Sequence, residues 1–114
     1  MPWGSVEVEP EVEKWFLGLS HNHRGTVAFY VDLLADQGAH LGEPYTKQLS
    51  GKVRELRFHL DGNPVRVTYW IASGRRIILL TVFRKTRQRE TAEVERAVKA
   101  WAECVAQEHT VDEG

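Results

Sequence analysis

Two arginines in neighbouring predicted strands carry the chemistry needed to bind a phosphate group. Arg57 and Arg66 lie in strands that are joined by the turn sequence Asp-Gly-Asn-Pro at 61–64. Because side chains alternate along a strand, a hairpin that sets Leu60 opposite Val65 places both arginines on one face of the sheet. A planar guanidinium binds phosphate oxygens in pairs, so two of them side by side would stabilise negative charge on phosphorus.

The sequence leaves a structural role open for the same pair. Arg57 could form an ion pair with Glu55, or it could lie solvated on an open sheet face. The strand pattern favours the functional role, because the predicted core lies on the opposite face and contains neither arginine. The predicted core residues of the two strands include Leu56, Phe58, Val65 and Val67.

Two further side chains share the predicted arginine face. His59 is a candidate general base, because a histidine titrates near neutral pH, and an exposed strand histidine without a function is the alternative. Trp70 is a candidate to stack on a nucleic-acid base, and packing beneath a helix is its alternative role.

The Lys and Arg residues are concentrated in one part of the chain. Residues 47–89 hold eleven Lys/Arg and two acids, a net charge of +9, whereas residues 1–46 and 90–114 each hold two Lys/Arg and seven acids, a net charge of −5. The total of −1 therefore hides a basic sheet between acidic flanks, which indicates a polyanionic partner. Besides the arginine pair, the candidates for contacts with phosphates are Lys52, Arg54, Arg84, Arg87 and Arg89. Ordinary solvated charge is the alternative for the loop residues among them.

Length and composition limit the class of protein. A chain of 114 residues predicts a single domain, 1–114. The one cysteine, Cys104, excludes an internal disulfide and fits a reducing cytosol, so a cytoplasmic protein is expected. No apolar run approaches the roughly 20 residues of a membrane span, and the first residues do not form a signal peptide. His21 and His23 lack further ligands at metal-binding spacing, so we expect no metal site and no cofactor.

Hydrophobic spacing predicts the helices that must hold the sheet in place. Apolar residues at 12, 15, 16 and 19 predict a helix that begins at Pro10, and a second helix, capped by Asn22, runs to about Gln37. The two form a hairpin over the sheet, and residues 38–52 form a connector. A last helix begins near Glu90 or Thr91, and its end, 109–114, is expected to be a frayed tail.

The predicted sheet is an antiparallel meander over 53–60, 65–71 and 76–83, with a short edge strand at 3–8. The segment 76–83 is apolar on both faces, which places it inside the sheet. The predicted fold class is therefore α+β: a small twisted antiparallel sheet with an N-terminal helical hairpin and a C-terminal helix.

This order of elements, together with particular residues, resembles the RelE/ParE toxin superfamily and, within it, the HigB-like branch. The resemblance runs from Pro10 to Trp101, and the order and spacing of its motifs are more specific than any one of them. The matching residues are Leu41, Pro44, Lys47, Leu49 and Gly51, then Glu55-Leu56-Arg57, Arg66-Val67-Thr68-Tyr69, Phe83-Arg84-Lys85-Thr86 and Glu93-Val94-Glu95-Arg96-Ala97.

The resemblance implies a small toxin that arrests growth and is neutralised by an antitoxin, for which a HigA-like helix-turn-helix protein is expected. RelE- and HigB-like members cut mRNA, usually within the ribosome, whereas ParE-like members poison DNA gyrase. The basic sheet favours RNA, since binding to a protein target does not need a net charge of +9. A gyrase-inhibiting toxin and a non-catalytic nucleic-acid-binding relative are the alternatives.

RNA cleavage without a metal uses the neighbouring 2′-hydroxyl as the nucleophile. The protein must stabilise the added charge on phosphorus and protonate the leaving 5′-oxygen. Arg57 and Arg66 are the candidates for the first task. Lys85 matches the second lysine of the F-x-K-K pattern of the branch and is a candidate acid or charge stabiliser, with solvated loop charge as the alternative. His59 lies outside the matched pattern.

Overall fold

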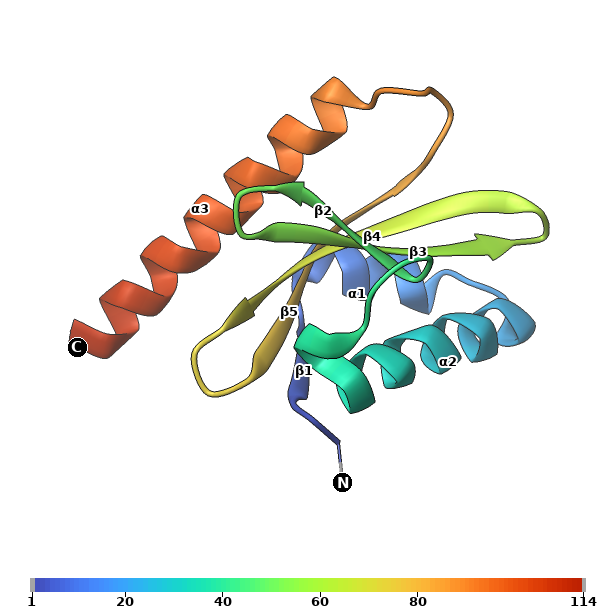
Figure 1. The fold of residues 1–114 in the computed structure, drawn as a ribbon. Helices are drawn as coiled ribbons and strands as arrows, with labels where there is room; N and C mark the ends of the chain where they lie inside the picture. The colour runs from blue at the N-terminus through green and yellow to red at the C-terminus, as the bar shows by residue number, and fades with distance from the viewer. Residues whose placement is uncertain (1, 114) are drawn as a thin grey trace.

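The computed structural model describes residues 2–113, and side chains are described as far as Gln107. Two helices lie on one side of a sheet and a long C-terminal helix crosses the other (Figure 1). The predicted α+β class, the helical hairpin and the C-terminal helix are confirmed. The elements are β1 (Ser5–Val8), α1 (Pro10–Leu17), α2 (His21–Gln37), the 3-10 helix η1 (Gly38–His40), β2 (Thr46–Ser50), β3 (Val53–Leu60), β4 (Asn63–Ala72), β5 (Arg76–Arg84) and α3 (Thr91–Glu113).

The five strands form one sheet in the order β1-β5-β4-β3-β2. β3, β4 and β5 form the predicted antiparallel meander, with β4 at the centre. β1 lies parallel to β5, with Ser5 opposite Arg76 and Val8 opposite Leu79. The sheet is therefore mixed rather than wholly antiparallel, because β1 and β5 are far apart in the chain and no hairpin fixes their relative direction.

β2 occupies part of the segment 38–52, for which the sequence predicts only a connector. It pairs antiparallel with β3, and Thr46 lies opposite Leu56. An edge strand buries few side chains, so its residues lack the apolar alternation that would predict a strand. Thr46 is buried, and its hydroxyl donates a hydrogen bond to the carbonyl of Leu41 (2.5 Å), which fixes the start of the strand.

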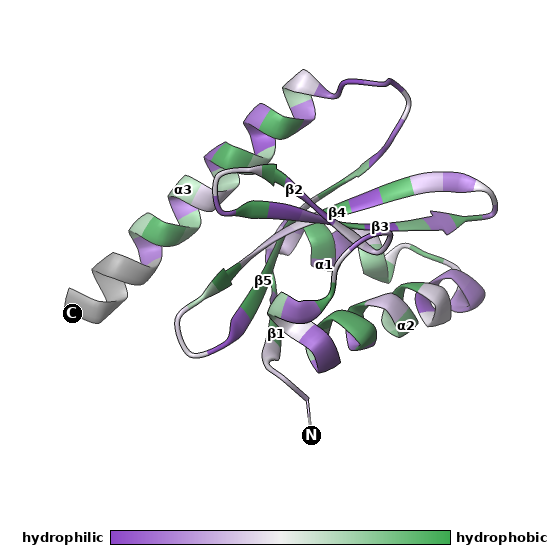
Figure 2. Cartoon of the chain, viewed as in Figure 1, coloured by the Kyte–Doolittle hydropathy of each residue, from purple (hydrophilic) through white to green (hydrophobic). Residues whose placement is uncertain are grey.

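The two faces of the sheet carry separate hydrophobic cores, and apolar residues follow the strands and helices that meet there (Figure 2). The core on the side of α1 and α2 contains all four strand residues predicted for it. Its buried members are Val12, Val27, Leu34, Leu41, Leu56, Phe58, Leu60, Val65, Val67, Tyr69, Ile77 and Leu79. The core under α3 consists of Val53, Trp70, Ala72, Ile78, Leu80, Ala97 and Cys104.

The ends of α2 are fixed by one hydroxyl and one glycine. Ser20, rather than the predicted Asn22, caps the helix, because its hydroxyl accepts a hydrogen bond from the N–H of His23 (3.2 Å). Gly38 ends the helix as predicted, with φ +51°. A Cβ atom at this position would lie 1.9 Å from the ring of Trp3, so the close approach of the N-terminal segment also requires glycine.

α3 continues to Glu113, through the segment from 109 on for which the sequence predicts a frayed tail. No glycine or proline interrupts the chain between the start of the helix and Glu113, so no residue type there stops it earlier. Gly114, the last residue of the predicted tail, lies outside the described residues.

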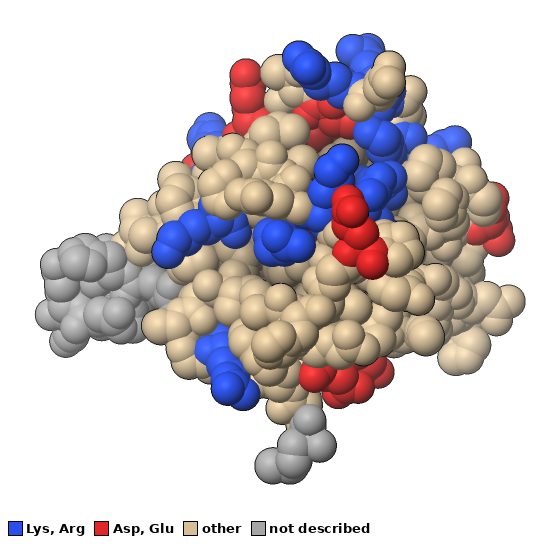
Figure 3. Space-filling model, viewed as in Figure 1, with Lys and Arg blue, Asp and Glu red and all other residues tan. Residues whose placement is uncertain are grey.

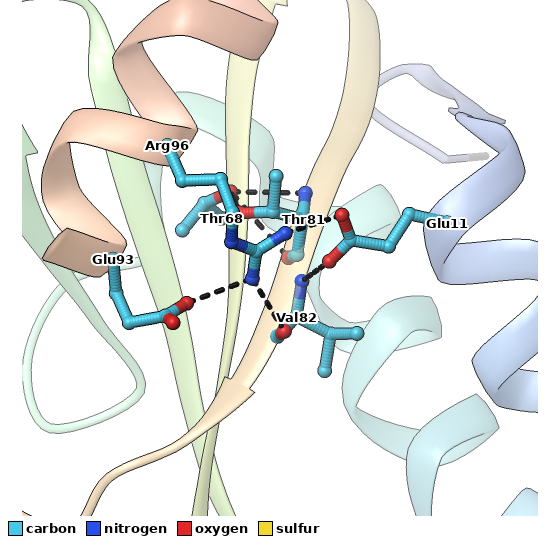
Figure 4. Close-up of polar contacts among 6 residues, drawn as sticks. All are labelled: Glu11, Thr68, Thr81, Val82, Glu93 and Arg96. Atoms are coloured by element: carbon cyan, nitrogen blue, oxygen red, sulfur yellow. Dashed lines mark hydrogen bonds and ion pairs between the residues drawn. The ribbon is translucent and has the colours of Figure 1, made fainter.

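Beyond the end of β1, side chains from α1 and α3 form hydrogen bonds with the unpaired backbone groups at the edge of β5. β1 pairs with β5 only as far as Leu79, so the N–H and C=O of Val82 have no strand partner on that side. Glu11 accepts a hydrogen bond from the N–H of Val82 (3.0 Å), and Arg96 donates one to its carbonyl oxygen (3.0 Å). Arg96 also donates to Glu93 (2.7 Å) and to Glu11, so one network joins α1, β5 and α3 (Figure 4).

Arg96→Met removes these donors while keeping much of the length of the side chain. We expect the free energy of unfolding to fall by about 1–2 kcal/mol, because the Val82 carbonyl loses its partner in a partly buried position. Equilibrium urea denaturation measures the change. Lys99→Met removes the same charge from an exposed position of the same helix and should alter stability by less than about 0.5 kcal/mol. If both variants lose the same free energy of unfolding, the hydrogen bonds of Arg96 do not stabilise the fold beyond the effect of its charge.

Candidate functional site

Arg57 of β3 lies directly opposite Arg66 of β4. The prediction that the two arginines share one face of the sheet is therefore confirmed. The predicted register is wrong by two residues, because Leu60 lies opposite Asn63 and not opposite Val65, and a shift of two residues leaves the faces unchanged. The shared face is the one that α3 covers farther along β4, around Trp70. The β3–β4 hairpin sets this register, so the local sequence of the turn positions the pair.

Glu55 lies beside both arginines on the same face. Its Oε1 is 3.8 Å from the Nε of Arg57 and 3.8 Å from the Nε of Arg66, distances too long for a hydrogen bond. Within the described part of the chain, neither Nε has a hydrogen-bond partner. The cluster therefore holds two guanidinium groups around one carboxylate and leaves N–H groups unused.

The three side chains of this cluster differ in burial. Arg66 keeps 7% of its side-chain surface exposed, Glu55 keeps 10% and Arg57 keeps 29%. The expectation that neither arginine belongs to the protein interior is wrong for Arg66, because β4 is the central strand and has neighbours on both sides. Arg66 donates a hydrogen bond from a terminal nitrogen to the carbonyl of Val65 (3.1 Å).

The surroundings of Arg66 disfavour its positive charge. Burial lowers the pKa of Arg66, the charge of Arg57 lowers it further, and the charge of Glu55 acts in the opposite direction without outweighing them. A bound anion would reverse this balance, because it would supply the negative charge and the acceptors that the cluster lacks.

A β-bulge in β5 sets the face on which Lys85 lies. The register shifts after the pair formed by Thr68 and Thr81, so Leu80 is an extra residue in β5. The hydroxyls of Thr68 and Thr81 lie 2.5 Å apart and bond to each other at the bulge (Figure 4). Without the extra residue, alternation along β5 would place Lys85 on the face opposite Arg66.

His59 and Lys85 lie one row beyond the arginine pair. His59 is opposite Pro64, and the N–H of Lys85 donates to the carbonyl of Pro64 (2.9 Å), which continues the ladder past the end of β5. One face of the sheet therefore carries two adjacent rows of side chains across the strands. Arg57 and Arg66 form the first row, and His59 and Lys85 lie in the second. Arg57, Arg66 and His59 line one hollow, whereas Lys85 shares their face of the sheet but is not among the residues that line it.

A hollow of about 330 Å³ opens beside the arginines just before β2 begins at Thr46, where the edge of β3 has no neighbouring strand. Neither Tyr30, which lies in the predicted second helix, nor Tyr45, which lies in the predicted connector, was singled out as a site residue from the sequence. The one signal for Tyr45 is an aromatic residue directly after Pro44. The hollow is lined by Tyr30, Pro44, Tyr45, Arg57, Phe58, His59 and Arg66.

The connection between β5 and α3 is braced by Glu90. Its carboxylate accepts hydrogen bonds from the N–H of Thr86 (2.8 Å) and of Arg87 (2.7 Å), and these two bonds lower the pKa of Glu90. The Nζ of Lys85 donates to the carbonyl of Gln88 (3.3 Å). The connection therefore holds its basic residues next to the arginine face.

Lys and Arg side chains gather on the side of the molecule that presents β2, β3 and the connection to α3 (Figure 3). Lys52, Arg87 and Arg89 are exposed there and could contact phosphates on either side of the arginine pair. Their role in RNA binding stays a prediction.

Three of the predicted contact residues lie away from this site. Trp70 is 8% exposed beneath α3, with its ring centroid 6.2 Å from that of Trp101, so the structure contradicts a base-stacking role for it. Arg54 falls on the face opposite the arginine pair and donates to the buried hydroxyl of Thr46 (3.2 Å). Arg84 falls on that opposite face as well, because its position in β5 alternates with that of Phe83.

Among the described residues, no group of three or more His, Cys, Asp or Glu side chains could hold a metal ion. His21 and His23 lie in the first turn of α2 rather than in a turn before it, and His23 contacts Asp61 (Nε2–Oδ2 2.7 Å). None of the helices in the described part of the chain is both long and apolar enough to cross a membrane. Cys104 is buried, and burial raises the pKa of its thiol.

Arg66→Met and Glu55→Gln should change the stability of the protein in opposite directions. Arg66→Met removes a charge that the surroundings disfavour, so we expect a free energy of unfolding that is unchanged or higher by up to about 1 kcal/mol. Glu55→Gln leaves two guanidinium groups together without a carboxylate, and we expect a loss of about 1–3 kcal/mol. Urea denaturation at neutral pH measures both. A large loss with Arg66→Met would identify Arg66 as a structural ion-pair partner.

Glu90→Ala should loosen the connection between β5 and α3. Because the pKa of Glu90 is lowered in the folded protein, the brace is stable above the ordinary pKa of a glutamate and is lost as the pH falls through the lowered value. Hydrogen exchange should show reduced protection of the Thr86 and Arg87 amides in Glu90→Ala at neutral pH, and in the wild-type protein in acid. Glu95→Ala is the control. Unchanged protection in Glu90→Ala would contradict the brace.

Comparison with known proteins agrees with this architecture. Residues 14–102 match the sequence profile of a family described as phage-derived protein Gp49-like. No match to a curated protein was found. The fold is similar to that of the E. coli toxin RelE, solved in the free state as a double arginine-to-alanine mutant, with a TM-score of 0.59 at 15% identity over 87% of this chain and 97% of that chain. The chain thus belongs to the phage-derived Gp49-like family and has the fold of the RelE-like toxin superfamily.

Proposed function

We propose that the protein is the toxin of a type II toxin–antitoxin pair and that it cuts mRNA on the ribosome without a metal ion. The Gp49-like family and the RelE fold support the toxin. The observation that carries the enzymatic part is the guanidinium of Arg66. It is almost fully buried beside Arg57, and its Nε has no partner in the described part of the chain. A charged group in such surroundings is typical of a site that receives an anion.

The arginine pair suits the charge that develops during RNA cleavage. The 2′-hydroxyl attacks the neighbouring phosphorus, the bond to the 5′-oxygen breaks, and the products are a 2′,3′-cyclic phosphate and a 5′-hydroxyl. Phosphorus carries additional negative charge in the transition state, and Arg57 and Arg66 donate hydrogen bonds to its non-bridging oxygens. The donors are already in place and partly shielded from water, so little reorganisation accompanies the reaction.

We assign the two proton transfers to His59 and Lys85. His59 is exposed at the rim of the hollow and accepts the proton of the 2′-hydroxyl as the general base. Lys85 lies on the same face and gives a proton to the leaving 5′-oxygen, or stabilises its charge as a cation. Both residues lie in the row next to the arginine pair, His59 on β3 and Lys85 just past the end of β5.

The partner that restrains such a toxin is an antitoxin. The HigB-like pattern in the sequence predicts a small helix-turn-helix protein of the HigA-like kind, encoded next to the toxin. Co-expression of that protein should restore growth to cells that express the toxin.

Single-turnover cleavage of mRNA on programmed ribosomes tests the enzymatic proposal. Arg57→Met and Arg66→Met should each lower the cleavage rate by about 100-fold or more, because they remove contacts that are strongest in the transition state. Sedimentation with ribosomes should show a smaller loss of binding. Arg75→Met, in the distant turn between β4 and β5, removes the same charge and should cleave at the wild-type rate.

The other outcomes separate the alternatives. Cleavage at the wild-type rate by both variants would place the active site elsewhere. A wild-type protein that binds ribosomes but never cuts would be a non-catalytic relative. Inhibition of gyrase supercoiling without RNA cleavage would identify a gyrase-poisoning toxin.

A further inference from the structure

The hollow beside the arginines has an aromatic wall that the cleavage chemistry does not use. Phe58 is buried in the core, and Tyr30 stacks on it with ring centroids 5.2 Å apart and an interplanar angle of 10°. The ring of Tyr45 follows at 6.4 Å from that of Tyr30. This row of rings leads from the core to the surface, where Tyr45 is 41% exposed. The ring of Tyr45 therefore packs near Tyr30 on its inner side and is exposed to solvent on its outer side.

A backbone hydrogen bond fixes Tyr45 next to the arginines. The N–H of Arg57 donates a hydrogen bond to the carbonyl of Tyr45 (2.8 Å). Tyr45 directly precedes Thr46, the first residue of β2, which lies opposite Leu56 of β3. Past this bond the edge of β3 has no neighbouring strand, and the hollow opens over it with His59 on its rim. An exposed aromatic ring and two guanidinium groups thus line the same hollow.

An aromatic ring beside two guanidinium groups suits the base and the phosphate of one nucleotide. Arg57 lines the hollow with 29% of its side-chain surface exposed, so its guanidinium can donate to a phosphate oxygen, and an aromatic ring stacks on the flat face of a base. A base inside a duplex has both faces covered by its neighbours, so only an unpaired base could reach Tyr45. We propose that the hollow is a subsite for one unpaired base of single-stranded RNA, which stacks on Tyr45 while Arg57 and Arg66 hold the adjacent phosphate. The proposal rests on the proposed function for the identity of the nucleic acid.

Binding to two matched strands tests the subsite. One probe is a short single-stranded RNA, and the other is a ribose-phosphate strand of the same length that carries no bases, both measured by fluorescence anisotropy at one low salt concentration. Tyr45→Ala should reduce the preference for the strand with bases by roughly 5- to 100-fold, because base–aromatic stacking contributes that much to affinity. Its affinity for the abasic strand should not change. Tyr45→Phe keeps the ring and should keep the preference.

Phe29→Ala is the matched control, because Phe29 is an aromatic residue of α2 that is 56% exposed and does not line the hollow. It should bind both strands as the wild-type protein does. Urea denaturation of Tyr45→Ala checks that the variant is folded. An unchanged preference in Tyr45→Ala would overturn the subsite. A wild-type protein that binds neither strand, or binds both equally, would overturn it as well.

Binding does not require cleavage, so the two proposals fail separately. A Tyr45-dependent preference in a protein that never cuts RNA would support the subsite and contradict the nuclease. Cleavage by a protein whose base preference does not depend on Tyr45 would support the nuclease and overturn the subsite.

Discussion

A buried guanidinium with a like charge beside it is the constraint on which the site depends. Arg66 is held in the central strand, Arg57 is its cross-strand neighbour, and the carboxylate of Glu55 is 3.8 Å from each Nε. Removing a charge from water costs several kcal/mol unless close hydrogen bonds replace the lost hydration, and here they do so only in part. A bound anion would supply the missing acceptors, and its binding would then stabilise the sheet.

The rest of the fold keeps this cluster both rigid and accessible. The β3–β4 hairpin fixes the pairing of the two arginines, and β2 begins only at Thr46, so the hollow beside them stays open. The bulge at Leu80 brings Lys85 to the same face. The network of Arg96 and Glu11 holds β5 where β1 no longer pairs with it, so elements far from the arginine pair support the strand that leads to Lys85.

The parts of the site that follow from local sequence could be predicted, and those that depend on distant contacts could not. Alternation along β3 and β4 was enough to place Arg57 and Arg66 together, because one tight turn sets their register. Alternation gives no information about which part of a face a remote helix covers, so the sequence left two roles open for Trp70, base stacking and packing beneath a helix, and the structure shows the second. β2 was missed because an edge strand buries too few side chains to leave a periodic pattern, and Tyr45 was lost with it.

The central claim is that an anion-binding arginine pair on a RelE-like fold cuts RNA. Its most direct test is primer extension on cellular mRNA after brief expression of the protein, beside expression of Arg66→Met at the same level. The account predicts growth arrest and new 5′ ends within coding regions for the wild-type protein, and neither for Arg66→Met. Normal growth with intact mRNA at high expression of the wild-type protein, or identical new ends in both samples, would contradict it.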